Sequence, residues 1–277
     1  MNQTHLHASS HGFEEHFYVV MLLGALSLLL YAYAAILSNR RYSPWPPIRY
    51  FLWFAGNLSA VAASAGPLAA KAHLDFTAHM IGHLLLGMLA PLLLVLAAPM
   101  TLMLRVLPLG VSRRLARFHR SAPIRVLCDP ATASILNVGG LVVLYTTSLY
   151  MWMQQSVALH LLVHVHVFLA GCLFTVALIG VDPTPHRTSR TYRGIVLIVS
   201  LAAHGLLSKY IYAHPPAGVP AAQAETGGMV MYYGGDVIDA VLIFMFFYQG
   251  YKSGRAWKAQ RTVRTTDGSR CRSEGRS

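Results

Sequence analysis

Residues 76–98 read FTAHMIGHLLLGMLAPLLLVLAA, and this stretch decides the fold. It contains no Asp, Glu, Lys or Arg, and it is long enough to cross a bilayer, for which a helix needs about 20 mostly apolar residues. A helix is expected because the hydrocarbon offers no water to bond an open backbone. Two histidines, His79 and His83, lie near the beginning of this predicted span.

The same pattern recurs along the chain. Seven segments qualify as transmembrane helices: 17–37, 48–66, 76–98, 131–150, 157–180, 194–212 and 229–248. The sequence therefore predicts an all-α polytopic membrane protein, a bundle of seven transmembrane helices. We divide it into an outer His-rich N-terminal segment (1–16), a transmembrane domain (17–250) and a basic cytoplasmic tail (251–277) that is expected to be disordered.

The composition agrees with a chain surrounded by the lipid bilayer. It is 55% hydrophobic and 12% charged over 277 residues, whereas soluble domains carry about 25% charged residues. A net charge of +12 can indicate nucleic-acid binding, but here the charges lie between and after the apolar segments, so no nucleic-acid partner is expected. The first residues lack a basic n-region, so no cleavable signal peptide is expected.

Lys and Arg placement predicts the orientation. Of the 22 basic residues, all but Lys71 and Lys209 lie in the first, third and fifth connections or in the tail. Cytoplasmic loops carry the excess of Lys and Arg, so the N-terminus is outside and the C-terminus inside (N-out/C-in). The segment 111–127 mixes Arg with apolar residues and is expected to lie along the inner membrane surface. The predicted location is a bacterial inner membrane, crossed in several passes.

The histidines mark the opposite side. Asp75, His79 and His83 recur every four residues and so share one stripe of a helix, and His160 and His164 repeat that spacing on another span. A pair at i, i+4 can present two imidazoles to one metal ion. Two such pairs at the same outer depth favour a shared metal or cofactor site. For the outer His5, His7, His11 and His16, either metal binding or an exposed polar tail is possible.

Other intramembrane polar residues extend the candidate site. His204 lies near mid-depth of its span, and Asp236 lies within a turn of Asp239 in the outer half of the last span. Ionisable groups are costly inside a membrane, which makes them functional candidates. A single histidine such as His166 or His204 is also explained by a hydrogen bond between packed helices.

The identity of the metal is inferred from the available ligands. Imidazole suits zinc, copper, iron and nickel, while thioether sulfur favours Cu(I). Met80 follows His79, and Met151 and Met153 lie in the connection before His160. Methionines in membrane helices are also explained by packing. A His/Met copper site is the first choice, with Asp75, Met80, Met151, Met153 and Asp236 as accessory residues.

Longer stretches of the sequence resemble a known family. The residues 79–86, HMIGHLLL, followed by 90–99, APLLLVLAAP, resemble the signature of the CtaG family of cytochrome c oxidase assembly factors in caa-type systems. The span with His160 and His164, which ends in GVDPTP at 180–185, and the GGMVMY stretch at 227–232 are similar to further parts of that family. The resemblance covers most of residues 15–250.

The resemblance implies a role in maturing cytochrome c oxidase by helping copper reach its active subunit. It carries over His79, His83, His160, His164 and His204 as metal ligands, with an oxidase subunit as partner and a periplasmic copper donor as a second partner. No step makes or breaks a bond in a substrate, so the expected protein is a metal chaperone and not an enzyme.

Three alternatives stay open at this point. A seven-helix zinc hydrolase would use three histidines and a carboxylate that polarises water. A bis-histidine haem protein would take one axial ligand from each of two helices. A transporter would need a polar path through the inner half of the bundle, where the spans hold few ionisable groups.

Overall fold

In the computed structural model the chain forms helices and no strand within the residues that are described, 3–182 and 188–274. Side-chain surroundings are described for 17–182 and 188–251. Five helical stretches in these ranges are long and apolar enough to cross a membrane: Phe17–Arg41, Phe76–Leu96, Val157–Leu178, Arg190–Ala213 and Ala221–Tyr251. The bent pair Pro130–Thr146 and Leu149–Gln155 makes a sixth if it is counted as one span. The prediction of an all-α membrane protein is confirmed.

Every predicted span coincides with helical structure. Five predicted spans lie in single helices: α1 (Gln3–Arg41), α2 (Pro47–Ser64), α12 (Val157–Leu178), α13 (Arg190–Ala213) and α14 (Ala221–Glu274). The shortest of these, α2, is not among the candidate membrane spans, so the total of seven spans stays a prediction.

The third span is a composite of α4 (Phe76–His83), the π-helical η1 (Leu84–Leu89) and α5 (Ala90–Leu96). Pro91 has no N–H, and a proline ring crowds the carbonyl four residues earlier, which here belongs to Gly87. The wider π turn directly before Pro91 accommodates this crowding. Such π turns recur at functional sites, and this one begins directly after His83.

The fourth span is bent, although the sequence predicts one helix over 131–150. It consists of α9 (Pro130–Ser134), η2 (Ile135–Gly139) and α10 (Gly140–Thr146), and it meets α11 (Leu149–Gln155) at 81°. At the break, Thr147 has an extended backbone, and the hydroxyls of Thr146 and Thr147 donate to the carbonyls of Val142 and Val143, each at 2.7 Å.

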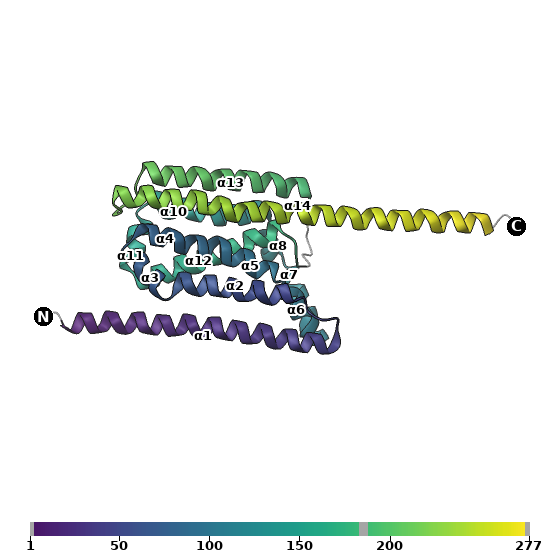
Figure 1. Ribbon diagram of the computed structural model, residues 1–277, viewed down its shortest axis with the longest axis horizontal. Helices are drawn as coiled ribbons and strands as arrows, with labels where there is room; N and C mark the ends of the chain where they lie inside the picture. Colours follow the sequence, from purple (N-terminus) through teal and green to yellow (C-terminus); the bar gives the residue numbers. More distant parts are fainter. Residues whose placement is uncertain (1–2, 183–187, 275–277) are drawn as a thin grey trace.

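The helices form a bundle in which the third span is central. Helix α2 packs between α1 and α5, α12 packs against α5 and η1, and α14 packs on both α13 and α4 (Figure 1). The most apolar window of the third span is 61% buried, against 11% for α1 at the edge. Polar side chains near the beginning of the third span are therefore shielded from the lipid on several sides.

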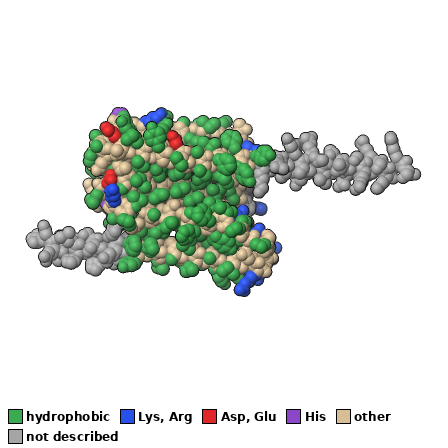
Figure 2. All heavy atoms as spheres, viewed as in Figure 1, with side chains coloured by type: hydrophobic (Ala, Val, Ile, Leu, Met, Phe, Trp, Pro, Cys, Tyr) green, Lys and Arg blue, Asp and Glu red, His purple; other side chains and the backbone are tan. Residues whose placement is uncertain are grey.

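Short helices cover the two ends of the bundle. Helix α3 (Pro67–Ala72) lies beside the beginning of α4, while α6 (Pro99–Val106), α7 (Leu109–His119) and α8 (Ala122–Leu127) lie at the opposite end, from which α14 extends (Figure 1). Hydrophobic side chains cover most of the flank in Figure 2, and charged side chains gather mainly toward the two ends. The basic segment 111–127 thus lies at one end of the bundle, and its position along the inner membrane surface stays a prediction.

The last helix extends beyond the predicted transmembrane domain. Helix α14 runs to Glu274, and the disorder expected for residues 251–277 stays a prediction. No proline occurs after Pro220, so no residue in this segment lacks a backbone donor and stops the helix. The domain division itself stays a prediction, and the side chains of 1–16 and 252–277 lie outside the described residues.

A fusion experiment checks the orientation. After residue 250, a reporter that works in the cytoplasm should be active, and one that works in the periplasm should be inactive. The reason is that α6–α8 and the start of the basic tail lie at one end of the bundle, and basic residues favour the cytoplasmic side. The measurement compares a fluorescent-protein fusion with an alkaline phosphatase fusion at the same position. Phosphatase activity after residue 250 would reverse the orientation and place the histidines on the inner side.

Candidate metal centre

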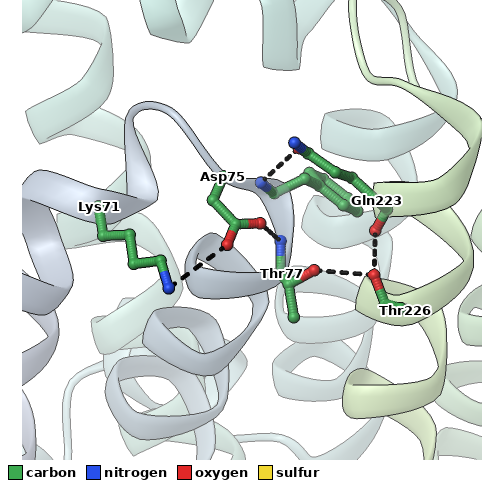
Figure 3. A network of polar contacts seen from close by, with 6 residues as sticks. Lys71, Asp75, Thr77, Gln223 and Thr226 are labelled. Atoms are coloured by element: carbon green, nitrogen blue, oxygen red, sulfur yellow. Dashed lines mark hydrogen bonds and ion pairs between the residues drawn. The ribbon is translucent and has the colours of Figure 1, made fainter.

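The beginning of α4 is fixed by a network of polar contacts (Figure 3). Asp75 is the N-cap of the helix, because its Oδ1 accepts a hydrogen bond from the Thr77 N–H at 2.8 Å. Its Oδ2 lies 3.9 Å from Lys71 Nζ. The Gln223 side chain accepts from the Phe76 N–H at 3.0 Å, and the hydroxyls of Thr77 and Thr226 are 2.9 Å apart. These contacts join α4 to the first turn of α14.

Asp75, which the sequence predicts as an accessory residue of the site, has both of its carboxylate oxygens in contact with other groups. Replacing Asp75 with Ala should destabilise the protein by about 1 kcal/mol, because the cap is lost. Asp75→Asn should be close to wild type, since its amide oxygen can still cap α4 and the ion pair with Lys71, which is 69% exposed, contributes little. Thermal unfolding in detergent measures both variants. If Asn were as harmful as Ala, the negative charge of Asp75 and not the cap would be its contribution.

His79 is buried between aromatic rings. Its side chain is 5% exposed, and its Nε2 lies 3.1 Å from the Tyr145 hydroxyl. Its ring stacks on Phe76 and meets Tyr150 edge to face, with ring centres 5.1 Å apart in the second case. Tyr145 therefore holds one nitrogen of His79, and the surrounding rings fix the plane of the imidazole.

His83 and His204 form the closest approach of histidines from two different spans in the buried centre. The spacing of four residues places His83 one turn below His79, and α13 brings His204 to it, with ring centres 6.3 Å apart. Both side chains are 7% exposed. The Nε2 atoms of both are buried and have no hydrogen-bond partner among the described residues. A buried imidazole nitrogen without a partner is unfavourable, so the arrangement calls for a ligand or a proton at this place.

Glycines lie next to the His83 and His204 rings, at positions where a side chain would crowd them. A side chain at Gly87 would begin 3.2 Å from the His83 ring, and one at Gly235 would begin 2.8 Å from Cε1 of His204. Helix α14 thus approaches His204 with bare backbone. The same helix places Asp236 next to this glycine, but the Asp236 side chain is exposed, whereas Asp239 is buried at 8% exposure.

His160 and His164, the pair that the sequence predicts on the outer side, form a second group near the beginning of α12. Their ring centres are 4.2 Å apart, and His73, which follows α3, stacks on His160 at 4.8 Å. Both side chains of the pair are half-buried. The predicted i, i+4 proximity of His160 and His164 is confirmed, and His73, which was not among the predicted site residues, lies beside them.

The predicted metal ligands do not come together in a single site in this structure. Within the described side chains, no three or more His, Cys, Asp or Glu residues are arranged to hold a metal ion. His5, His7, His11 and His16 lie outside the residues whose side chains are described. The five predicted ligands fall into a buried group (His79, His83 and His204) and the outer pair His160 and His164.

His166 is explained by helix packing. Its Nε2 lies 3.1 Å from the carbonyl oxygen of Leu136 in η2, and the ring lies over Gly140, where a side chain would begin 2.5 Å from Nε2. This contact joins α12 to the irregular fourth span. A role of His166 in metal binding has no support from its position.

Two of the three accessory methionines are buried beside the histidines. Met80 and Met153 are at most 1% exposed and belong to one apolar cluster with Tyr145, Tyr150 and Met231. Met151 is half-buried on α11. Tyr145 and Tyr150 were missed as neighbours of the histidines, because they come from a different span and no local spacing connects them to His79.

Comparisons with known proteins place the chain in a family. It is 35% identical to uncharacterised proteins of Mycobacterium bovis and Mycobacterium tuberculosis over 182 residues, and 31% identical to one of Mycobacterium leprae over 176 residues. Each match covers 60% of this chain and 27% of the relative, so the matched region is about a quarter of the relatives' length. No solved structure matches significantly. The family model described as cytochrome c oxidase caa3 assembly factor matches residues 29–253, which include the buried histidines and both tyrosines, and the chain belongs to this family.

Proposed function

We propose that this protein binds Cu(I) among the buried histidines of its transmembrane bundle and supplies it to a cytochrome c oxidase subunit during assembly. The family provides the assembly role. The observation that carries the copper proposal is the pair of buried Nε2 atoms of His83 and His204 that have no hydrogen-bond partner among the described residues.

The separation of the two rings suits a bridging ion. A metal about 2 Å from each nitrogen, with each nitrogen about 1.1 Å from its ring centre, places the ring centres about 6 Å apart in a linear arrangement. The observed separation is 6.3 Å. Cu(I) accepts two nearly linear ligands, whereas Zn²⁺ prefers four in a tetrahedron. The absence of a three-ligand group among the described residues is therefore less restrictive for Cu(I) than for zinc.

Thioether sulfur lies in the apolar cluster whose aromatic rings contact His79. Met80 is one residue from His79 on α4, and Met80, Met153 and Met231 pack in one buried cluster. Thioethers favour Cu(I) over Cu(II) and over harder cations. The cluster would let copper exchange between sulfur and nitrogen inside an apolar surrounding that excludes water.

The outer pair has a different proposed task. His160 and His164 are half-buried and lie in the outer half if the N-terminus is outside, so they would receive copper from a periplasmic donor before it reaches His79, His83 and His204. In this proposal the protein lies in a bacterial inner membrane and acts as a chaperone, because it transfers an ion and makes no covalent bond.

The test is the metal content and optical spectrum of the detergent-purified protein after incubation with Cu(I) under reducing conditions. We expect about one copper per chain in the wild type and a clear loss in His79→Ala/His83→Ala. In cells, the same variant should insert normally but lower oxidase activity. Stoichiometric zinc with hydrolytic activity, or a Soret band, would replace the proposal with a zinc hydrolase or a haem protein.

A further inference from the structure

A cavity lies away from His79, His83 and His204, at the end of the bundle that carries the basic connections. Its volume is about 860 Å³, within the usual range of small-molecule sites. One wall is the last part of α12, with Leu169, Leu173 and Val176, and the opposite wall is formed by α6 and α7, with Leu104 and Leu115. The walls are thus mostly aliphatic, as an acyl chain would require.

The cavity is continuous with the lipid-facing surface. Leu169 on α12 and Val126 on α8 both line it and are 53% and 55% exposed. Helices α7 and α8 contact each other, and α8 contacts α9. The short helices α7 and α8 therefore cover the cavity at one end of the bundle. An acyl chain from the surrounding bilayer can enter the cavity from the side.

Positively charged side chains line one edge of this apolar cavity. Arg120 and Arg125, from the ends of α7 and α8, line the cavity and are exposed. Neither forms an ion pair with a carboxylate among the described residues. His119 lines the same edge and is half-buried. Two guanidinium groups that converge on one opening favour a phosphate group.

The two carboxylates of the cavity form no ion pair with Arg120 or Arg125 among the described residues, and both accept hydrogen bonds from other groups. Asp182 accepts from the backbone N–H groups of Met100 and Thr101 at the start of α6, at 3.2 and 2.9 Å, and from the Thr101 hydroxyl. Asp129 accepts from the Ala131 N–H and from the Tyr192 hydroxyl at 3.0 Å. Both carboxylates hold helix ends in place.

We infer that this cavity binds an anionic glycerophospholipid of the inner leaflet, with an acyl chain along α12 and the phosphate at Arg120 and Arg125. Apolar walls, a lateral opening and unpaired arginines at one edge match the three parts of such a molecule, and basic pockets between membrane helices recognise anionic headgroups in this way. The bound lipid would fill the space between α7 and α12 and so hold α7 and α8 against the bundle. The inference is independent of copper binding.

Native mass spectrometry of the full chain, titrated with phosphatidylglycerol or phosphatidylcholine, tests the inference. Arg120→Gln/Arg125→Gln should weaken phosphatidylglycerol binding by about thirtyfold, at roughly tenfold or less per arginine. The matched control is Arg113→Gln/Arg114→Gln, which removes the same charge from α7 at residues that do not line the cavity. Equal loss in both double variants, or equal binding of the two lipids by the wild type, would overturn the proposal.

A change in the apolar wall provides the second arm. Leu169→Trp replaces an aliphatic side chain by a larger aromatic one at an exposed position of the cavity wall. Folding should therefore be retained, while the cavity volume available to the acyl chain decreases. Bound phosphatidylglycerol should dissociate more readily in the gas phase than from wild type. If Leu169→Trp binds and retains this lipid as the wild type does, the acyl chain does not occupy the cavity and the inference fails.

Discussion

Replacing His83 and His204 together should abolish copper binding, from about one ion per chain to none, while the protein still folds and inserts. The two rings come from different spans and their buried Nε2 atoms have no partner among the described residues. Removal of both leaves no imidazole pair in the buried centre, since His79 Nε2 is already held by Tyr145. The measurement is copper per chain after incubation with Cu(I) and gel filtration.

The outer pair provides the matched comparison. His160→Ala/His164→Ala removes the same two functional groups from the half-buried cluster, and we expect it to retain bound copper but to load more slowly from a donor. His214→Ala, at an exposed position after α13, should behave as wild type. If the outer double variant lost its copper and the His83/His204 variant kept it, the proposed site would move to the outer end of α12.

A conservative variant separates ligand loss from misfolding. His83→Gln/His204→Gln keeps polar side chains of similar length in the same packing, but an amide is a poor Cu(I) ligand. It should unfold near the wild-type temperature and still bind no copper. Full copper binding by this variant would remove both histidines from the proposed mechanism.

Local spacing predicted the contacts within one helix but not those between helices. Because residues four apart share a helix face, the sequence placed His79 beside His83 and His160 beside His164, and the structure agrees for the latter pair at 4.2 Å. It did not pair His83 with His204, because that contact depends on how α13 packs in the bundle and leaves no periodic trace. Tyr145 was missed for the same reason.

Asp75 shows that one local signal can have two interpretations. An Asp directly before a helix that opens with Phe76 and Thr77 is a common N-cap, and the structure shows this hydrogen bond at 2.8 Å. The sequence analysis made Asp75 an accessory residue of the metal site because it lies on the same helix stripe as His79 and His83. A cap turns the side chain back onto its own helix, which competes with any contact further along that stripe.

The bend in the fourth span is a second feature that local sequence signals did not predict. Its apolar residues predict a single helix over 131–150, but α10 ends at Thr146 and the backbone of Thr147 is extended. The bend turns α11 away at 81°, and it brings Tyr150 and Met153 into the cluster with Phe76 and Met80. A hydropathy pattern reports burial but not this change of direction.

Replacing Gly171 with Ala should destabilise the protein by more than 2 kcal/mol and lower its unfolding temperature by several degrees. A Cβ at this position would lie 2.2 Å from the Gly87 carbonyl oxygen and 2.9 Å from Pro91, and the first of these is backbone that cannot rotate away. Helices α12 and η1 approach this closely because neither residue has a side chain, as is common where membrane helices cross.

The control for Gly171→Ala is Gly110→Ala on α7, where nothing lies within 4 Å of the new methyl group. Because alanine is the better helix former, Gly110→Ala should be neutral or stabilise by about 0.5–1 kcal/mol. Thermal unfolding of both variants in the same detergent, followed by tryptophan fluorescence, gives the comparison. Equal unfolding temperatures would mean that α12 and η1 separate without loss, and that their close contact does not stabilise the bundle.

The copper content of Gly171→Ala connects this packing to the proposed site. The clash falls on Gly87, and η1 begins directly after His83, so a displaced η1 moves the turn that carries the His83 ring. Linear coordination by two imidazoles tolerates little change in their separation, which is 6.3 Å between ring centres. Copper affinity should therefore fall in Gly171→Ala although every histidine is present, and it should stay unchanged in Gly110→Ala. Undiminished affinity in a destabilised Gly171→Ala would show that His83 is held by contacts other than the crossing of α12 and η1.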